Sequence, residues 1–279
     1  MEPVVIKVGG EVLEAEERLQ ALWKGVGFWW ARAPVVLVHG GGKQATDLAH
    51  AIGHRPRFVE GRRLTTDLDL RILLWTVCGE LNRRLVAQAQ SVGLPAVGLS
   101  GADGGLLQVR RRPPQQTASG LVDFGYVGDV WGVRPGLLYT LLRAGYLPVV
   151  APLGIDAEGQ LYNVNADTVA VEVALALRSQ ALLWLAASEG VWDEVGRPIQ
   201  RLSTHRAQEG LKAGWIRDGM RPKIEAALRA ATEGLRVWIG PVEALASLEK
   251  GTRLESPDSK GPQGPEGVAA PPFRRSEAR

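Results

Sequence analysis

Two apolar runs near the start of the chain each end in a cluster of glycines. Residues 4–13 read VVIKVGGEVL and residues 35–44 read VVLVHGGGKQ, so each β-branched run passes through bare backbone into a helical pattern. Unbroken apolar runs of this kind are typical of parallel strands that are buried on both faces of a sheet. The repeated order of strand, glycine turn and helix predicts an α/β fold with a mainly parallel central sheet.

The rest of the chain continues the alternation of helix and strand. Thr66 is predicted to cap a long helix over residues 67–91, whose apolar positions follow a 3.6-residue period. Residues 166–176 predict another helix, and residues 181–187 and 235–240 predict buried strands. An alternation that persists over this length favours one layered α/β architecture.

Two segments depart from this alternation. Residues 109–130 are polar and contain two adjacent prolines, which predicts a β-hairpin region with a proline-marked turn. Residues 256–279 are rich in proline and glycine and poor in apolar side chains, so we expect a disordered tail there.

Charge, cysteine content and hydropathy limit the class of protein. The formal net charge is only +3, and no basic stripe interleaved with aromatic residues predicts nucleic-acid binding. Cys78 is the single cysteine, and no Cys/His cluster has zinc-ligand spacing, so neither a disulfide nor a protein-bound metal is predicted. There is no run of 18 apolar residues and no signal segment before the first strand, so we expect a cytoplasmic protein that does not bind membranes.

The two glycine turns are candidate anion sites. Glycine lets backbone N–H groups approach an anion that a Cβ atom would keep away, and Lys7 adds a positive charge beside the first turn. The second turn opens a helix, whose N-terminal dipole favours negative charge. Neither turn has the spacing of a P-loop or of a dinucleotide fingerprint. From the residues alone, plain structural turns remain the alternative.

Three later segments place polar residues next to predicted turns or helix starts. EGRRLTTD contains Arg63, NVNAD contains Asn163 and Asp167, and RDGMRPK contains Lys223. An arginine can hold a carboxylate through two parallel hydrogen bonds, and a lysine at a helix start opposes the helix dipole unless an anion binds there. A solvated arginine, a helix-capping aspartate and a surface lysine are the alternatives. His39, at the end of the second strand, is interpreted as structural.

The order of these segments resembles the amino acid kinase family. The matching patterns are Lys-x-Gly-Gly, His-Gly-Gly-Gly, Gly-x-Arg-x-Thr, Asn-x-Asn-Ala-Asp and Asp-Gly-Met-x-x-Lys, spread over about residues 3–254. The resemblance is strongest to the branch that phosphorylates N-acetylglutamate in arginine synthesis. It implies a three-layer α/β/α sandwich, with residues 1–170 binding the acyl amino acid and forming a dimer interface and residues 171–255 binding ATP.

The same resemblance assigns roles to individual residues. The implied reaction transfers the γ-phosphoryl group of MgATP to a side-chain carboxylate, which needs positioning and charge neutralisation more than a general base. The implied catalytic residues are Lys7, Lys223 and Asp167, the aspartate orienting both lysines. The implied phosphate ligands, besides the two lysines, are Gly9, Gly10 and the N–H of Gly41. The implied substrate ligands are Gly40, Gly41, Arg63 and Asn163.

Three features separate this chain from the family pattern. Ala187 replaces the aspartate that usually ends the strand near the nucleotide, and Arg62 replaces an apolar residue. No helix precedes the first strand, which in this family implies a homodimer without arginine feedback, paired through the helix over residues 67–91.

Two alternative functions remain: a kinase for carrier-protein-linked aminoadipate or glutamate, and a non-catalytic ligand sensor on the same fold.

Overall fold

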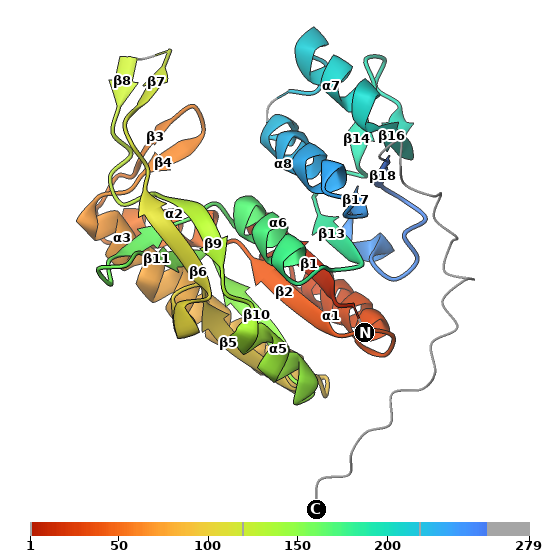
Figure 1. Ribbon diagram of the computed structural model, residues 1–279, viewed down its shortest axis with the longest axis horizontal. Helices are drawn as coiled ribbons and strands as arrows, with labels where there is room; N and C mark the ends of the chain where they lie inside the picture. Colours follow the sequence, from red (N-terminus) through yellow and green to blue (C-terminus); the bar gives the residue numbers. More distant parts are fainter. Residues whose placement is uncertain (1, 119, 218, 256–279) are drawn as a thin grey trace, which may run out of the picture.

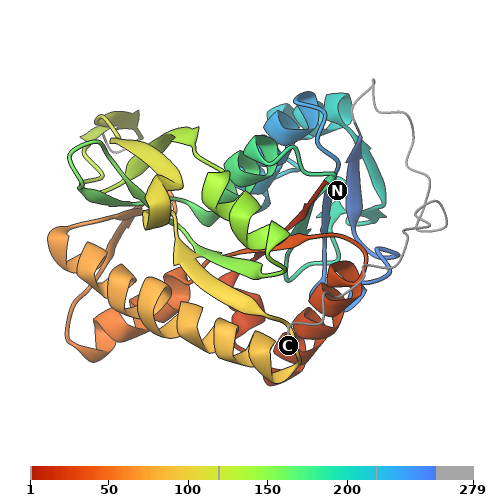
Figure 2. The same cartoon turned by 60° about the horizontal axis from the view of Figure 1, so that its bottom comes forward.

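The computed structural model describes residues 2–118, 120–217 and 219–255. The predicted tail, residues 256–279, lies outside the described residues. Within them, helices cover both faces of a central sheet, and Figure 2 shows the resulting three layers edge-on. The predicted α/β/α sandwich is therefore confirmed.

The central sheet has eight strands, and the predicted mainly parallel order is confirmed. β17 and β18 pair antiparallel, while the other neighbouring strands pair parallel. The order across the sheet is β16 (Arg201–Ser203), β18 (Thr252–Glu255), β17 (Val237–Gly240), β13 (Ala181–Leu185), β1 (Val4–Val8), β2 (Val35–His39), β10 (Leu147–Ala151) and β5 (Ala96–Ser100).

Alternate side chains of the central strands enter two separate cores. Val5 of β1 belongs to one core and Ile6 to the other, and both are fully buried, which explains the unbroken apolar runs. Helices α5 (Gly136–Arg143), α6 (Ala166–Ala176), α7 (Thr204–Ala213) and α8 (Met220–Thr232) contribute to the first core. The second core includes α1 (Glu16–Trp30), α4 (Asn82–Ser91) and the 3-10 turn η4 (Val242–Ala244).

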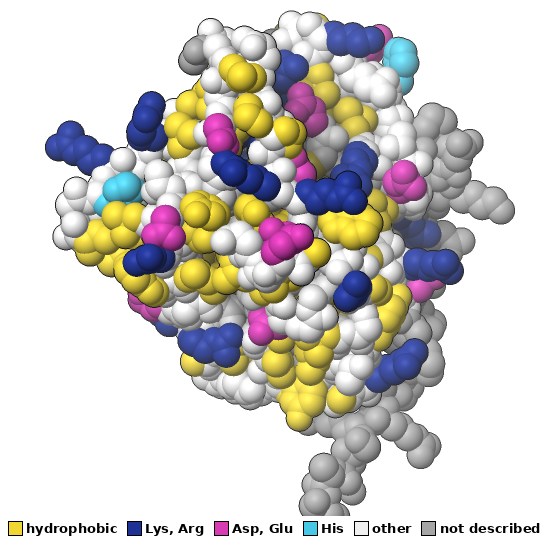
Figure 3. Space-filling view, turned by 60° about the vertical axis from the view of Figure 1, so that its left-hand side comes forward, with side chains coloured by type: hydrophobic (Ala, Val, Ile, Leu, Met, Phe, Trp, Pro, Cys, Tyr) yellow, Lys and Arg dark blue, Asp and Glu magenta, His cyan; other side chains and the backbone are white. Residues whose placement is uncertain are grey.

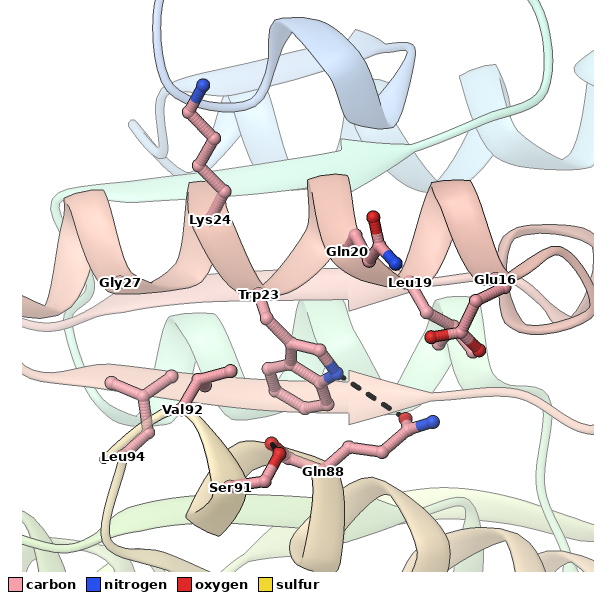
Figure 4. Close-up of a pocket in the computed structure, with 10 residues that line it drawn as sticks. All are labelled: Glu16, Leu19, Gln20, Trp23, Lys24, Gly27, Gln88, Ser91, Val92 and Leu94. Carbon is pink, nitrogen blue, oxygen red and sulfur yellow. Dashed lines mark hydrogen bonds between the residues drawn. The ribbon is translucent and has the colours of Figure 1, made fainter.

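A shallow groove marks the junction of α1 and α4. Its volume is about 450 Å³, and Trp23 of α1 donates an indole N–H to the side-chain oxygen of Gln88 of α4 across it, at 3.4 Å. Figure 4 shows the indole of Trp23 extending from α1 toward α4. The contact ties the two helices of this layer together at some distance from the glycine turns.

The predicted long helix is continuous but is not uniform. Thr66 caps α3 (Asp67–Leu73) as predicted, and Asp69 completes a reciprocal capping box with it. The next two turns, η2 (Leu74–Leu81), are π-helical before α4 resumes normal geometry. The 3.6-residue pattern did not predict this widening, which commonly occurs near functional sites.

Short strands form a separate region beside the main sheet, at the upper left of Figure 1. The hairpin β7 (Gln115–Thr117)–β8 (Gly120–Val122) lies within the predicted hairpin region. The two prolines precede β7 and do not mark the hairpin turn, so that detail of the prediction is wrong. The other short strands on this side are β3 (Arg57–Val59), β4 (Arg62–Leu64), β6 (Leu107–Arg111), β9 (Gly128–Val133), β11 (Leu153–Ile155) and β12 (Leu161–Asn163). A further hairpin, β14 (Val191–Trp192)–β15 (Pro198–Ile199), belongs to the other side of the molecule, where Figure 1 shows β14 beside α7.

Candidate active site

A large cleft opens where β1 and β2 end. These strands pair in parallel register, so their glycine turns leave the same edge of the sheet side by side. The Gly40 N–H donates to the Val8 carbonyl at 2.9 Å, and a Cβ atom on Gly40 would lie 3.7 Å from the Gly10 nitrogen. The cleft has a volume of about 1320 Å³ and is lined by both turns, by η1 (Gly10–Leu13) and by the start of α2 (Gly42–Ala51).

A buried ion pair joins β1, just before the first glycine turn, to α6. The Lys7 ammonium lies 2.6 Å from a carboxylate oxygen of Asp167, and the lysine residue is only 6% exposed. Asp167 is held in the first turn of α6 because the Asn165 side chain caps that helix, accepting from the Asp167 N–H at 2.7 Å. The ammonium also lies 5.7 Å from the ring centre of the buried Trp184. The predicted contact of Lys7 and Asp167 is therefore present, and both residues line the cleft.

Lys223 is placed differently. Its ammonium donates to the Gly219 carbonyl at 2.9 Å, within the first turn of α8. Asp167 pairs with Lys7 in this structure, so the expectation that it contacts both lysines is met for one of them only. Gly219 and Arg221 line the cleft, so the first turn of α8 borders the same space.

Arg63 enters the cleft from the β3–β4 hairpin. Its guanidinium donates to the Gly42 carbonyl at 3.0 Å and to the Thr46 hydroxyl at 2.6 Å, both on α2. It lies 4.8 Å from the ring centre of Phe58. Burial lowers the pKa of Arg63, and the nearby Asp69 carboxylate opposes this shift. The residue is thus a buried cation fixed against the helix that follows the second glycine turn.

Arg62, the residue before Arg63, lies on the surface, whereas Arg63 is buried. Arg62 is exposed and donates to the Gln115 side chain of β7 at 3.1 Å. In the adjacent turn, the Glu60 carboxylate accepts from the Ala118 N–H at 3.0 Å, so the β3–β4 and β7–β8 hairpins support each other at the cleft rim. Arg63 is therefore better placed than Arg62 to hold a ligand inside the cleft.

Asn163 reaches the cleft from the end of β12. Its amide donates to the Thr65 hydroxyl at 3.1 Å, and its backbone N–H donates to the Tyr126 carbonyl at 2.9 Å. The predicted substrate residues Gly40, Gly41, Arg63 and Asn163 all line the one cleft, as do Gly9 and Gly10.

The loop after β13 lacks a carboxylate at the place of Ala187. The Ser188 hydroxyl donates to the Gly190 carbonyl at 3.1 Å, and Glu189 pairs with Lys250 at 3.0 Å. Glu189 is half exposed and is committed to that lysine, so it does not substitute directly for the missing aspartate.

A buried histidine lies directly beneath the second glycine turn and was interpreted from the sequence only as structural. His39 is fully buried, with Nδ1 2.8 Å from the Gly40 carbonyl and Nε2 2.9 Å from the amide nitrogen of Asn82. No sequence motif singled out Asn82. An amide within the apolar pattern of a predicted helix was the signal that could have identified it.

The burial of His39 predicts a pH-dependent loss of stability. Burial lowers the pKa of His39 from 6.5 to about 4, while the bond to Gly40 acts in the opposite direction. As the pH falls from 6.5 to 4, the unfolded chain binds a proton that the folded chain does not, so the free energy of unfolding decreases. We expect roughly 2 kcal/mol of the decrease between pH 7 and pH 4.5 to come from His39. Denaturant unfolding at pH 7 and pH 4.5 measures it, and His39→Asn should lack that component. An equal decrease in both proteins would contradict the assignment.

The charged residues that line the cleft are mixed in sign, with Lys43, Arg112 and Arg221 beside Glu60 and Glu225. Figure 3 likewise shows Lys and Arg side chains interspersed with acidic ones on the face of the molecule that it presents. In the described part of the chain, no cluster of three or more His, Cys, Asp or Glu side chains is arranged to hold a metal ion. Nor does any helix there combine the length and apolar character needed to span a bilayer.

Sequence comparison identifies the family. A profile described as the amino acid kinase family matches residues 2–241, a span that contains both glycine turns, the Lys7–Asp167 pair and the start of α8. The chain belongs to the amino acid kinase family. Kinases of this family use ATP as the phosphoryl donor.

Curated relatives in the amino acid kinase family share most of the chain. An acetylglutamate kinase of Methanopyrus kandleri is 43% identical over 236 residues, covering 83% of this chain and 92% of that protein. An acetylglutamate kinase of Sorangium cellulosum is 41% identical, covering 84% of each chain. An acetylglutamate kinase of Aquifex aeolicus is 36% identical, covering 83% and 81%.

Solved structures of the amino acid kinase fold superimpose on most of this chain. N-acetylglutamate synthase from Neisseria gonorrhoeae, complexed with coenzyme A and N-acetyl-glutamate, matches with a TM-score of 0.78 and 26% identity. That match covers 91% of this chain, which spans 59% of the synthase chain. Carbamate kinase from Giardia lamblia matches with a TM-score of 0.66 and 15% identity, covering 91% and 98%, which shows the shared fold.

Proposed function

We propose that this protein is an acetylglutamate kinase, which phosphorylates the side-chain carboxylate of N-acetyl-L-glutamate with ATP in arginine biosynthesis. The observation that carries the proposal is the buried Lys7–Asp167 pair beside two adjacent glycine turns, in one cleft with Arg63 and Asn163. The choice of substrate is supported by the curated relatives named acetylglutamate kinase, which are 36–43% identical to this chain over the aligned residues.

The reaction joins two anions. A carboxylate oxygen of the substrate forms a bond to the γ-phosphorus of ATP while the bond to the bridging oxygen of ADP breaks, giving an acyl phosphate. The carboxylate is already ionised, so no general base is needed. Lys7 neutralises charge on the transferring group, Asp167 holds its ammonium in place, and the N–H groups of Gly9, Gly10 and Gly41 donate to phosphoryl oxygens.

Arg63 and Asn163 hold the α-carboxylate of the substrate in this proposal. With the α-carboxylate bound there, the side-chain carboxylate that receives the phosphoryl group would lie beside Gly40 and Gly41 in the same cleft. Arg63 is already fixed by α2, so little conformational freedom is lost when substrate binds.

Lys223 and Mg²⁺ complete the proposed nucleotide site. Lys223 would leave the Gly219 carbonyl and contact the nucleotide phosphates when ATP binds at the start of α8. Mg²⁺ would be held largely by the phosphates themselves, since the described residues provide no ready-made carboxylate cluster for it.

An ADP-release assay tests the function. The purified protein should release ADP in the presence of MgATP and N-acetylglutamate, and far more slowly with glutamate, aspartate or N-succinylglutamate. A preference for carrier-linked aminoadipate or glutamate would assign it to the carrier-dependent kinases. No turnover of any acceptor, together with measurable ligand binding, would make it a sensor.

We also propose two lobes and a homodimer. Residues 1–170 supply β1, β2, β5 and β10, and residues 171–255 supply the other half of the central sheet. The proposed dimer interface is the exposed face of the long helix over residues 67–91. Trp75 is 55% accessible there and Leu68 is 38% accessible, and exposed apolar side chains of this kind favour contact between two copies of the chain. Light scattering should give twice the monomer mass of 30.1 kDa. Trp75→Glu should shift it toward the monomer, and a hexamer would contradict the proposal. A cytoplasmic location likewise remains a prediction.

A further inference from the structure

A directed chain of hydrogen bonds runs from the surface to the second glycine turn. Arg83 donates to the Asn82 side-chain oxygen at 2.6 Å, which leaves the amide nitrogen of Asn82 facing inward. That nitrogen lies 3.0 Å from the Val149 carbonyl and 2.9 Å from His39 Nε2. At the far side of the ring, Nδ1 lies 2.8 Å from the Gly40 carbonyl.

These partners permit one tautomer of the histidine. The guanidinium of Arg83 can only donate, so the orientation of the Asn82 amide is set. The amide nitrogen donates to Nε2, which must carry a lone pair, and the Gly40 carbonyl accepts from Nδ1, which must carry the proton. Both contacts of the ring agree on the neutral Nδ1–H form.

The tautomer controls the direction of one peptide group. The described residues contain no cis peptide bond, so the Gly40 carbonyl and the Gly41 N–H point in opposite directions. His39 draws the carbonyl toward the protein interior, which turns the N–H away from the ring. Among the described residues, no acceptor is bonded to that N–H, and Gly41 lines the cleft.

Neighbouring atoms pack closely around the hydrogen-bonded residues Asn82 and Arg83 and around the second glycine turn. A Cβ atom on Gly98 of β5 would overlap the Asn82 amide oxygen and the Arg83 guanidinium, so only glycine fits at this position. A Cβ atom on Gly41 would lie 2.9 Å from side-chain atoms of Leu81 and Val77 in η2. The long helix thus packs against the second glycine turn through Val77 and Leu81, while β5 packs against Asn82 and Arg83.

We propose that His39 and Asn82 are positioning residues for phosphoryl transfer, which hold the Gly40–Gly41 peptide with its N–H directed into the cleft. The inference rests on the proposed function, because the peptide N–H is useful only where a developing negative charge needs a fixed donor. His39 touches neither substrate nor nucleotide and acts through the backbone of the turn.

Nitrogen NMR of the intact protein tests the tautomer directly. The chain has four histidines, and the signals of His39 are those that disappear in His39→Asn. We expect the neutral Nδ1–H form at pH 7. An Nε2–H form or an imidazolium would overturn the proposal, whether or not any variant is active.

Kinetics of matched variants test the consequence. His39→Leu removes the donor, whereas His39→Asn retains an N–H close to the position of Nδ1. We expect His39→Leu to lower kcat at least about 10-fold with KM values within about threefold of wild type, because the donor acts in the transition state. His39→Asn should recover most of kcat.

Leu37→Val is the stability control, since Leu37 is fully buried in the second core together with Val35 of β2, the strand that also carries His39. It should lower the unfolding midpoint while leaving kcat unchanged. Equal kcat in His39→Leu and wild type, or no recovery in folded His39→Asn, would overturn the proposal. An inactive wild-type protein would instead refute the proposed function, and the NMR result would still stand.

Discussion

Replacing Lys7 with alanine should lower kcat at least about 100-fold while the fold survives, because each electrostatic contact of this type contributes roughly 3–4 kcal/mol to the transition state. Lys7 is 6% exposed and lies 2.6 Å from Asp167, so its charge acts in a site with little water to screen it. Steady-state ADP release and circular dichroism of the same preparation measure activity and folding together.

Asp167→Ala should reduce kcat by a comparable factor. Removal of the carboxylate leaves the Lys7 ammonium without its ion-pair partner, free to leave the position that the transferring group requires. Because the two side chains act as a unit, the double variant should be little slower than either single variant. Additive losses would show that they work independently.

Lys24→Ala is the charge-matched control. Lys24 is exposed on α1 at the edge of the groove beside Trp23, and Figure 4 shows its side chain pointing away from α4. The Lys24→Ala substitution changes the net charge by the same amount as Lys7→Ala and should leave kcat and KM unchanged. Near-normal turnover in Lys7→Ala and Asp167→Ala, set against this control, would refute the mechanism.

Replacing Arg63 with lysine should raise the KM for N-acetylglutamate by about 10–100-fold, since hydrogen bonds to charged groups contribute roughly 1.5–3 kcal/mol. A lysine keeps the charge but cannot bond to the Gly42 carbonyl, the Thr46 hydroxyl and a substrate carboxylate with one planar group. The KM for ATP should change much less, because Arg63 enters the cleft at the substrate end of the proposed site. Initial rates at varied concentrations of each substrate separate the two effects.

Arg62→Lys is the matched control for this prediction. Arg62 is exposed and donates to Gln115 on the neighbouring hairpin, so its replacement should alter the KM for acetylglutamate less than about threefold. The reverse result, a large effect at Arg62 and a small one at Arg63, would show that the other arginine binds the substrate. Thermal unfolding of both variants would detect any loss from the buried contacts of Arg63 with Phe58 and Asp69.

The sequence by itself determined the buried strands β1 and β2, the glycine turns that follow them and the family. The runs that became β1 and β2 are apolar at every position except Lys7 and His39, because both faces of those strands are covered by helices. Thr66 capped its helix as predicted, since a cap depends on groups only three residues apart. Such features follow from local chemistry and periodicity, which can be read without knowing which segments meet.

The family resemblance named several of the site residues, but only the tertiary structure decided how their side chains contact one another. Lys7 meets Asp167 because β1 and α6 lie against each other, and Arg63 differs from Arg62 because only one of two neighbouring residues can face α2. The π-helical segment and the His39–Asn82 contact likewise arise from packing between segments distant in sequence. Their energies depend on burial and on three-dimensional proximity, which no short-range pattern contains.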